Sequence, residues 1–142
     1  MPQLTLHYVP FELVPQEARL FVETTQAGFP SLAQDDMEEP IDLGSYLMQH
    51  PAASYVMRVS GHSMSDGGIS DGDLVVVSRA VDPRTGEIVV ALVDGGRTIK
   101  RLLRSNGRLW LVPEAERYDR VAVTETTEIE GVIVGLAKRY RR

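Results

Sequence analysis

The sequence contains no cysteine among its 142 residues. This absence excludes disulfide bonds, thiolate zinc sites and a cysteine nucleophile, and it fits a reducing compartment, so we expect a cytoplasmic location. No run approaches the ~20 apolar residues that a membrane-spanning helix needs. Residues 1–7 also lack the charged and apolar blocks of a signal peptide. We therefore expect no membrane contact.

Positive charge is scarce, since the formal net charge is -5 and only two lysines, Lys100 and Lys138, accompany thirteen arginines. A nucleic-acid-binding domain needs a basic face, so we expect no direct sequence-specific DNA binding. The basic tail at residues 138–142 is the local exception. We interpret it as a solvated terminus, with DNA contact as the alternative.

β-branched and aromatic runs dominate the chain from residue 54 onward, and Asp-Gly, Gly-Gly and Asn-Gly dipeptides separate them. The runs cover residues 55–59, 74–77, 87–93, 98–103, 109–112 and 131–136. This pattern predicts a mostly β fold, a compact antiparallel barrel-like sheet with at most one short helix. The helix is expected within residues 41–50, with Asp42 as its N-cap and Pro51 after its end.

Residues 1–40 differ from the rest because they hold five of the eight prolines and an acidic run at residues 35–39. Each proline removes a backbone donor and restricts the residue before it, so regular structure is hard to sustain there. We predict an extended N-terminal arm at residues 1–40 and a β domain at residues 41–142. Apolar residues recur in the arm, which favours docking on a surface over a free tail.

Ser63 and Lys100 carry the candidate chemistry. Ser63 stands in a glycine-containing turn between two strand-like runs, and Lys100 stands inside an apolar run. A desolvated lysine can lose its proton near neutral pH, whereas an arginine cannot, and a Ser-Lys nucleophile and base pair requires this property. Lys100 shares a strand face with Thr98 and Leu102, which would partly dehydrate it. The alternative is an edge lysine whose amine reaches water.

The turn around Ser63 also predicts an oxyanion site, because successive amide N–H groups of a turn can point the same way. We expect the backbone amides of His62 and Ser63 to be the donors. A turn serine that hydrogen-bonds its own backbone is the alternative. His62 is a poor base for Ser63, because neighbouring side chains in extended backbone diverge. His50 is interpreted as a cap of the short helix, and His7 lies in the arm.

The aspartates near this turn do not predict a calcium loop. Asp66, Asp71 and Asp73 lack the alternating ligand pattern that ends in a bidentate glutamate. We interpret them as turn formers, and we expect neither a metal nor a cofactor.

The dipeptide Ala27-Gly28 occurs once in the sequence, within the arm. A small residue before the bond and a glycine after it leave the carbonyl open, and an extended segment can lie in a groove. The chain itself is therefore a candidate substrate, although any linker can contain this dipeptide.

Several segments are similar to a known family. They are Gly28-Phe29-Pro30-Ser31, Ile41-Asp42-Leu43, His50-Pro51-Ala52, Ser60-Gly61 with Ser63-Met64, residues 66–74 and Lys100. From about residue 20 onward the chain resembles the UmuD-type self-cleaving proteins of SOS mutagenesis, which are related to LexA. The resemblance implies the LexA/UmuD-like fold, Ser63 as nucleophile, Lys100 as general base and cleavage between Ala27 and Gly28. His62 departs from the family's usual aspartate, and Ala27 departs from the cysteine of the best-known enterobacterial members.

The resemblance also implies partners. The intact protein would be a homodimer that cleaves slowly until the RecA–single-stranded DNA filament promotes the reaction. The shortened form would join a UmuC-type subunit as the accessory subunit of an error-prone translesion DNA polymerase in the SOS response. A non-catalytic β-barrel interaction module that regulates a polymerase or another partner is the alternative. A LexA-type repressor would need a helix-turn-helix domain, and a signal peptidase would need a membrane anchor.

Overall fold

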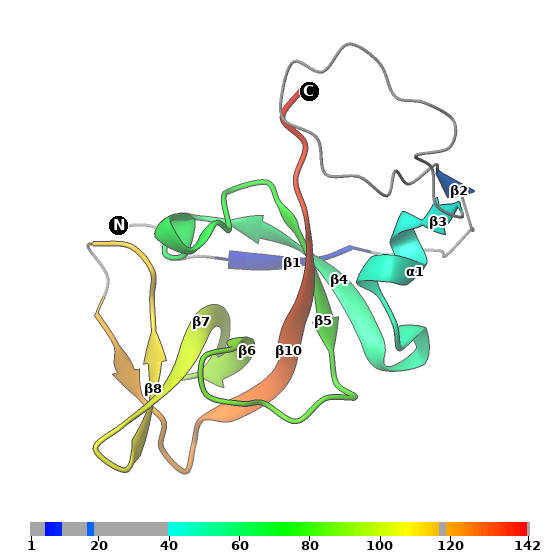
Figure 1. Cartoon of the computed structure of the whole chain (residues 1–142). Coiled ribbons are helices and arrows are strands. Elements are labelled where there is room, and N and C mark those ends of the chain that lie inside the picture. Colours follow the sequence, from blue (N-terminus) through cyan, green and yellow to red (C-terminus); the bar gives the residue numbers. More distant parts are fainter. Residues whose placement is uncertain (1–4, 10–16, 19–39, 117–118, 142) are drawn as a thin grey trace.

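The computed structural model describes residues 5–9, 17–18, 40–116 and 119–141, and it is built almost entirely of β-strands (Figure 1). The strands are β1 (Thr5–Val9), β2 (Glu17–Ala18), β3 (Ile41–Asp42), β4 (Ser54–Ser60), β5 (Leu74–Ser78), β6 (Ile88–Val93), β7 (Gly96–Ser105), β8 (Arg108–Val112), β9 (Val121–Ala122) and β10 (Glu128–Ala137). Eight of them form one antiparallel sheet in the order β1-β4-β5-β10-β6-β7-β8-β9, and β2 pairs with β3. The predicted mostly β, antiparallel fold is confirmed.

Tight turns join the strands where the sequence predicts them. Asp94 and Gly95 connect β6 to β7 with φ angles of 50° and 82°. Asn106 and Gly107 connect β7 to β8 with φ angles of 52° and 77°. Two consecutive residues with positive φ make the type I′ turn, whose twist matches that of the flanking strands. The turn at Asp94 and Gly95 sets the register in which Val89 faces Lys100 across the β6–β7 ladder.

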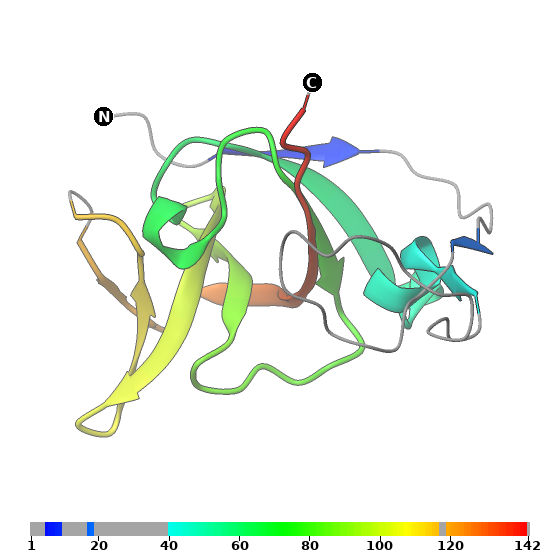
Figure 2. The ribbon, with the colours of Figure 1, turned by 45° about the horizontal axis from the view of Figure 1, so that its top comes forward.

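Strand β10 joins the two halves of the sheet, because it pairs with β5 through its second half and with β6 through its first half. The ladder shifts register between Ile129 and Gly131 and again between Ile133 and Gly135, and such bulges bend a strand. A Cβ atom at Gly131 would lie 2.7 Å from a Val77 methyl group, so the close crossing needs glycine. In Figure 2 the β7–β8 hairpin lies at one end of the molecule and α1 at the other.

Two apolar clusters form the core on either side of this bent sheet. The first contains Met57, Val59, Met64, Ile69, Val75, Val77, Val90 and Ile99. The second contains Val89, Ala91, Leu102, Leu111 and Val132. The first cluster includes Met64, which directly follows Ser63, and Ile99, which directly precedes Lys100. The main core is therefore also the support of the predicted catalytic pair.

The predicted helix is present but short, since α1 spans Leu43–Leu47. Asp42 is its N-cap as expected, with its carboxylate accepting a hydrogen bond of 3.2 Å from the Gly44 amide. The helix ends at Met48, whose N–H donates to the Gly44 carbonyl. The prediction that His50 caps this helix is therefore wrong: the His50 carbonyl instead accepts from the Ser54 hydroxyl at 2.7 Å, beside the 3-10 helix η2 (Pro51–Ala53).

Strand β1 lies within the proline-rich arm, where the sequence pattern predicts no strand. It lies at the edge of the main sheet and pairs with β4, Tyr8 opposite Met57. Part of the predicted arm therefore docks on the β domain. The candidate cleavage site, Ala27-Gly28, lies outside the described residues. Within the described ranges, no helix is long and apolar enough to cross a membrane.

Candidate active site

Ser63 lies in the segment between β4 and the 3-10 helix η3 (Ser65–Gly67), and its side chain is fully buried. Gly61 bends the chain out of β4 with a φ of 111°, a conformation that favours glycine. The amide of Gly61 donates to the Asp71 carboxylate at 2.9 Å. Met64 is also fully buried and anchors the turn in the first core cluster. The serine therefore occupies a fixed position beneath the surface.

Lys100 enters the same place from β7. Its amine donates to the Ser63 hydroxyl oxygen at 3.3 Å and to the Ile99 carbonyl at 3.0 Å, and it makes a short hydrogen bond to the Thr98 hydroxyl. Only 8% of the residue is exposed, so the alternative of an edge lysine reaching water does not fit. The structure thus brings together the two residues that the sequence singled out, and Thr98 shares their face as expected.

Burial makes the Lys100 amine chemically unusual. Desolvation lowers the pKa of Lys100 from 10.5 to about 8, because low-polarity surroundings disfavour the charged ammonium. Among the described residues, the amine hydrogen-bonds the Thr98 hydroxyl, the Ile99 carbonyl and the Ser63 oxygen, and none of these three groups carries a negative charge that would restore the ordinary pKa. A substantial fraction of the amine is therefore neutral just above neutral pH, as a general base needs to be.

The backbone around Ser63 leaves two donors available. The amides of His62 and Ser63 donate to no acceptor among the described residues, whereas the carbonyls of both residues accept hydrogen bonds. Ser65 donates to the His62 carbonyl, and Glu114 donates to the Ser63 carbonyl. The expectation that these two amides form an oxyanion site stays a prediction. The His62 side chain is exposed and makes no hydrogen bond to Ser63 in the part of the chain described.

Two of the three aspartates near the turn, Asp71 and Asp73, bind backbone amides as turn formers do. Asp71 binds the Gly61 amide, and Asp73 accepts from the Ser70 amide at 2.8 Å. The buried Asp73 carboxylate also pairs with Lys138 at 2.6 Å. Lys138 is thus anchored, although the sequence placed it in a solvated tail. In the described ranges, no group of three or more His, Cys, Asp or Glu side chains is arranged to hold a metal ion.

Glu114 is a residue that sequence reasoning missed. It follows β8, and its backbone amide and carbonyl hydrogen-bond the Ser63 carbonyl and the Asp66 amide, each at 2.8 Å. Its carboxylate also pairs with Arg101, the residue after Lys100. No spacing rule connects position 114 to position 63, so only its place after an apolar strand could have drawn attention to it.

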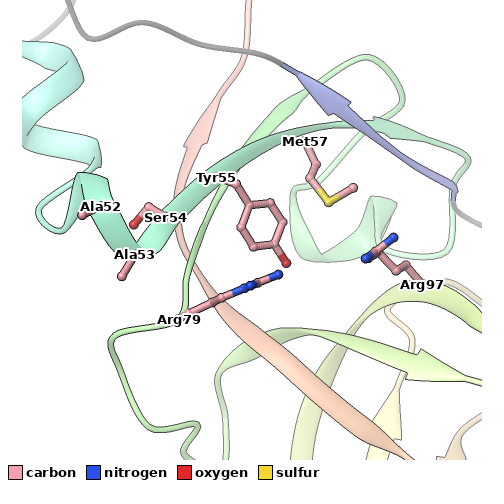
Figure 3. Close-up of a pocket in the computed structure, with 7 residues that line it drawn as sticks. All are labelled: Ala52, Ala53, Ser54, Tyr55, Met57, Arg79 and Arg97. Atoms are coloured by element: carbon pink, nitrogen blue, oxygen red, sulfur yellow. The ribbon is translucent and has the colours of Figure 1, made fainter.

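A surface cavity of about 440 Å³ lies elsewhere on the sheet (Figure 3). Its lining residues are Ala52, Ala53, Ser54, Tyr55, Met57, Arg79 and Arg97. Neither residue of the Ser-Lys pair lines it. Side chains alternate along a strand, so Arg97 faces away from the side of β7 that carries Thr98 and Lys100. This cavity therefore does not coincide with the Ser-Lys pair.

Comparisons with known proteins place the chain in a family. The sequence pattern of the Peptidase S24-like family matches residues 20–134. Protein ImpA of Escherichia coli is 43% identical over 123 residues, which cover 86% of this chain and 84% of ImpA. Protein SamA of Salmonella typhimurium is 40% identical over 130 residues, covering 92% and 91%. The LexA repressor of Hahella chejuensis is 40% identical over 116 residues, covering 80% of this chain and 58% of the repressor. The chain therefore belongs to the peptidase S24-like family, the family of LexA-type and UmuD-type self-cleaving serine peptidases.

Proposed function

We propose that this protein cleaves its own N-terminal arm between Ala27 and Gly28, with Ser63 as nucleophile and Lys100 as general base. One observation carries the proposal: the Lys100 amine lies 3.3 Å from the Ser63 hydroxyl oxygen inside the protein, where burial lowers its pKa to about 8. A neutral amine at hydrogen-bonding distance from a hydroxyl is the arrangement that activates a serine without histidine.

In the first step the neutral Lys100 amine accepts the proton of the Ser63 hydroxyl as the oxygen attacks the carbonyl carbon of Ala27. The carbonyl oxygen becomes negatively charged, and the amides of His62 and Ser63 would donate hydrogen bonds to it. Collapse of this intermediate breaks the bond to Gly28. Lys100, now an ammonium, returns its proton to the leaving amine, and an ester joins Ser63 to the Ala27 carbonyl.

In the second step water hydrolyses this ester. Lys100 accepts a proton from the water as its oxygen attacks, and it returns the proton to Ser63 when the ester breaks. The products are an N-terminal peptide of 27 residues and a C-terminal fragment of 115 residues, since 142 minus 27 leaves 115. The larger fragment keeps the predicted β domain at residues 41–142, whereas β1 and β2 leave with the N-terminal peptide.

The cellular role that we propose is that of UmuD-type proteins in the SOS response. The RecA–single-stranded DNA filament would promote cleavage, and the processed homodimer would serve with a UmuC-type subunit in an error-prone translesion DNA polymerase. Similarity to ImpA and SamA over most of their lengths supports this role.

The proposed homodimer needs a surface for a second copy. Three exposed apolar side chains that border one small cavity offer such a surface, namely Tyr46, Val81 and Val134.

Self-cleavage is tested by incubating the purified protein between pH 6 and 10 and following its mass. We expect a 115-residue fragment whose rate of appearance rises about tenfold per pH unit below pH 8 and then levels off, because only the neutral amine acts as a base. Ser63→Ala removes the nucleophile, and Lys100→Arg keeps a permanent charge, so both variants should give no fragment.

Lys138→Arg is the matched control, because it changes the other lysine while keeping a cation beside Asp73. This variant should cleave as the unmodified protein does. Cleavage that survives in Ser63→Ala, or a cut at another bond, would contradict the proposal. An intact mass at every pH and in the presence of the filament would favour the non-catalytic interaction module instead.

A further inference from the structure

The Ser-Lys pair is assembled from two segments that no strand ladder connects. Lys100 belongs to β7, whereas Ser63 lies in a turn outside the sheet. Residue 114 supplies the connection, because its amide donates to the Ser63 carbonyl and its carbonyl accepts from the Asp66 amide, both at 2.8 Å. Residue 114 therefore holds the backbone at Ser63 itself and at Asp66 in the 3-10 helix that follows it.

The side chain of Glu114 extends this connection to the lysine strand. The Arg101 guanidinium donates through Nε to the Glu114 carboxylate and through a second nitrogen to the Gly86 carbonyl at 2.6 Å. Arg101 directly follows Lys100 in β7. The last pair of the β7–β8 ladder is Arg101 opposite Val112, so the ion pair continues the contact beyond the end of β8.

The Glu114 carboxylate also packs closely against the segment that follows Ser63. A Cβ atom at Gly67, in η3, would lie 2.9 Å from the Glu114 carboxylate. Gly67 thus leaves the space that the carboxylate fills between the turn and Arg101. Both side chains of the ion pair are partly buried, so their geometry is more constrained than that of a pair free in solvent.

We propose that Arg101 and Glu114 are positioning residues that set the distance between Ser63 and Lys100. Neither touches the reacting atoms. They act by tying the residue after the base to the residue that holds the nucleophile's turn. The inference rests on the proposed self-cleavage. The distance matters for that reaction, because a displacement on the order of 1 Å between reacting groups lowers a rate about 100-fold.

The test compares self-cleavage of the full chain in Glu114→Ala, Glu114→Gln and Gly67→Ala with the unmodified protein across the pH range. We expect Glu114→Ala to lower the plateau rate by about 10- to 100-fold. The midpoint near pH 8 should stay unchanged, because the burial of Lys100 is not altered. Glu114→Gln keeps an acceptor for Arg101 and should recover part of the rate. Gly67→Ala disturbs the same contact from the other side and should also slow cleavage.

Glu130→Gln is the control, because Glu130 forms the comparable ion pair with Arg97 away from the Ser-Lys pair. It should cleave normally, and thermal unfolding of each variant shows that the assays use folded protein. A Glu114→Ala rate within twofold of the unmodified protein, an equal loss in Glu130→Gln, or a shifted pH midpoint would each overturn the positioning role. Failure of the unmodified protein to cleave, or cleavage by Ser63→Ala, would instead overturn the proposed function itself.

Discussion

At the scale of single residues, the unusual feature is a lysine kept where burial opposes its charge. Lys100 is 8% exposed, and no carboxylate contacts its amine in the described part of the chain. A pKa lowered from 10.5 to about 8 corresponds to about 3 kcal/mol of unfavourable free energy for the charged form, at 1.36 kcal/mol per unit. A surface lysine would carry no such cost. A neutral amine that acts as a general base explains why the fold keeps a lysine at this cost.

This cost predicts the effect of Lys100→Met on stability, measured by urea unfolding with Ser63→Ala in both proteins to prevent cleavage. The unfolded chain binds a proton at Lys100 up to pH 10.5, whereas the folded chain releases it above about pH 8. The stability of the lysine protein therefore rises with pH between these values. At pH 7 the Lys100→Met protein should be more stable than the lysine protein by on the order of 2 kcal/mol. The gain from removing the buried charge is partly offset by the loss of the hydrogen bonds that the amine makes.

The difference between the two proteins should shrink as the pH approaches 10.5. Other groups titrate equally in both chains, so they cancel in the comparison. A stability difference that does not depend on pH would show that the buried amine is not the titrating group.

At the scale of elements, the short turn after β4 decides where the nucleophile lies. Gly61 leaves the strand at a φ of 111°, the Asp71 carboxylate holds its amide, and Met64 returns the chain to the core. A glycine conformation, a hydrogen bond and a core contact thus help the Glu114 backbone to hold a segment that no ladder stabilises. A turn of this kind keeps the Ser63 hydroxyl still while leaving nearby amides available for a ligand.

Gly61→Ala tests this account of the turn. A side chain at a positive φ costs about 1–2 kcal/mol, so we expect lower stability by that amount and slower self-cleavage. Gly96→Ala is the matched control, because a Cβ atom there would meet only the Val93 carbonyl at 3.7 Å, an ordinary contact. The control should change stability by less than about 0.5 kcal/mol. Equal losses in the two variants, followed by urea unfolding and mass, would count against the turn as the sensitive element.

At the scale of the whole molecule, the two partners of the candidate site come from different halves of the sheet. Ser63 follows β4 in the half that contains β5, and Lys100 lies in the half that contains β6 and β7. Strand β10 joins the halves by pairing with β5 and β6, and the first core cluster contains side chains from both. The assembled pair therefore depends on the complete sheet rather than on either half alone.

The preformed pair limits what a promoting partner can contribute through protonation. With a pKa of about 8, roughly one tenth of Lys100 is neutral at pH 7, so complete deprotonation adds at most about tenfold to the rate. The proposed RecA–single-stranded DNA filament needs only to favour the conformer in which the arm occupies the site. We expect its acceleration of cleavage to be larger at pH 7 than at pH 10, by no more than about tenfold. A larger acceleration at pH 10, measured by fragment mass, would contradict this account.

Much of the fold follows from local sequence patterns. All six predicted strands are present, because each apolar β-branched run is bounded by a turn whose residues favour it. The prolines of residues 1–40 argue against a strand there, yet β1 is present. It is an edge strand, and an edge strand tolerates prolines close by that a central strand does not. The helix is shorter than expected, because Met48 already closes it three residues before Pro51.

The sequence by itself determined the two candidate groups and the reason for them, a serine in a glycine turn and one of only two lysines within an apolar strand. Such signals are local, since they depend on residue type and on neighbours along the chain. Only the tertiary structure decided that the two atoms lie 3.3 Å apart, that the amine is buried, and that Glu114 connects their segments. Distance, desolvation and contacts between remote segments arise from packing the whole sheet, and no spacing along the chain encodes them.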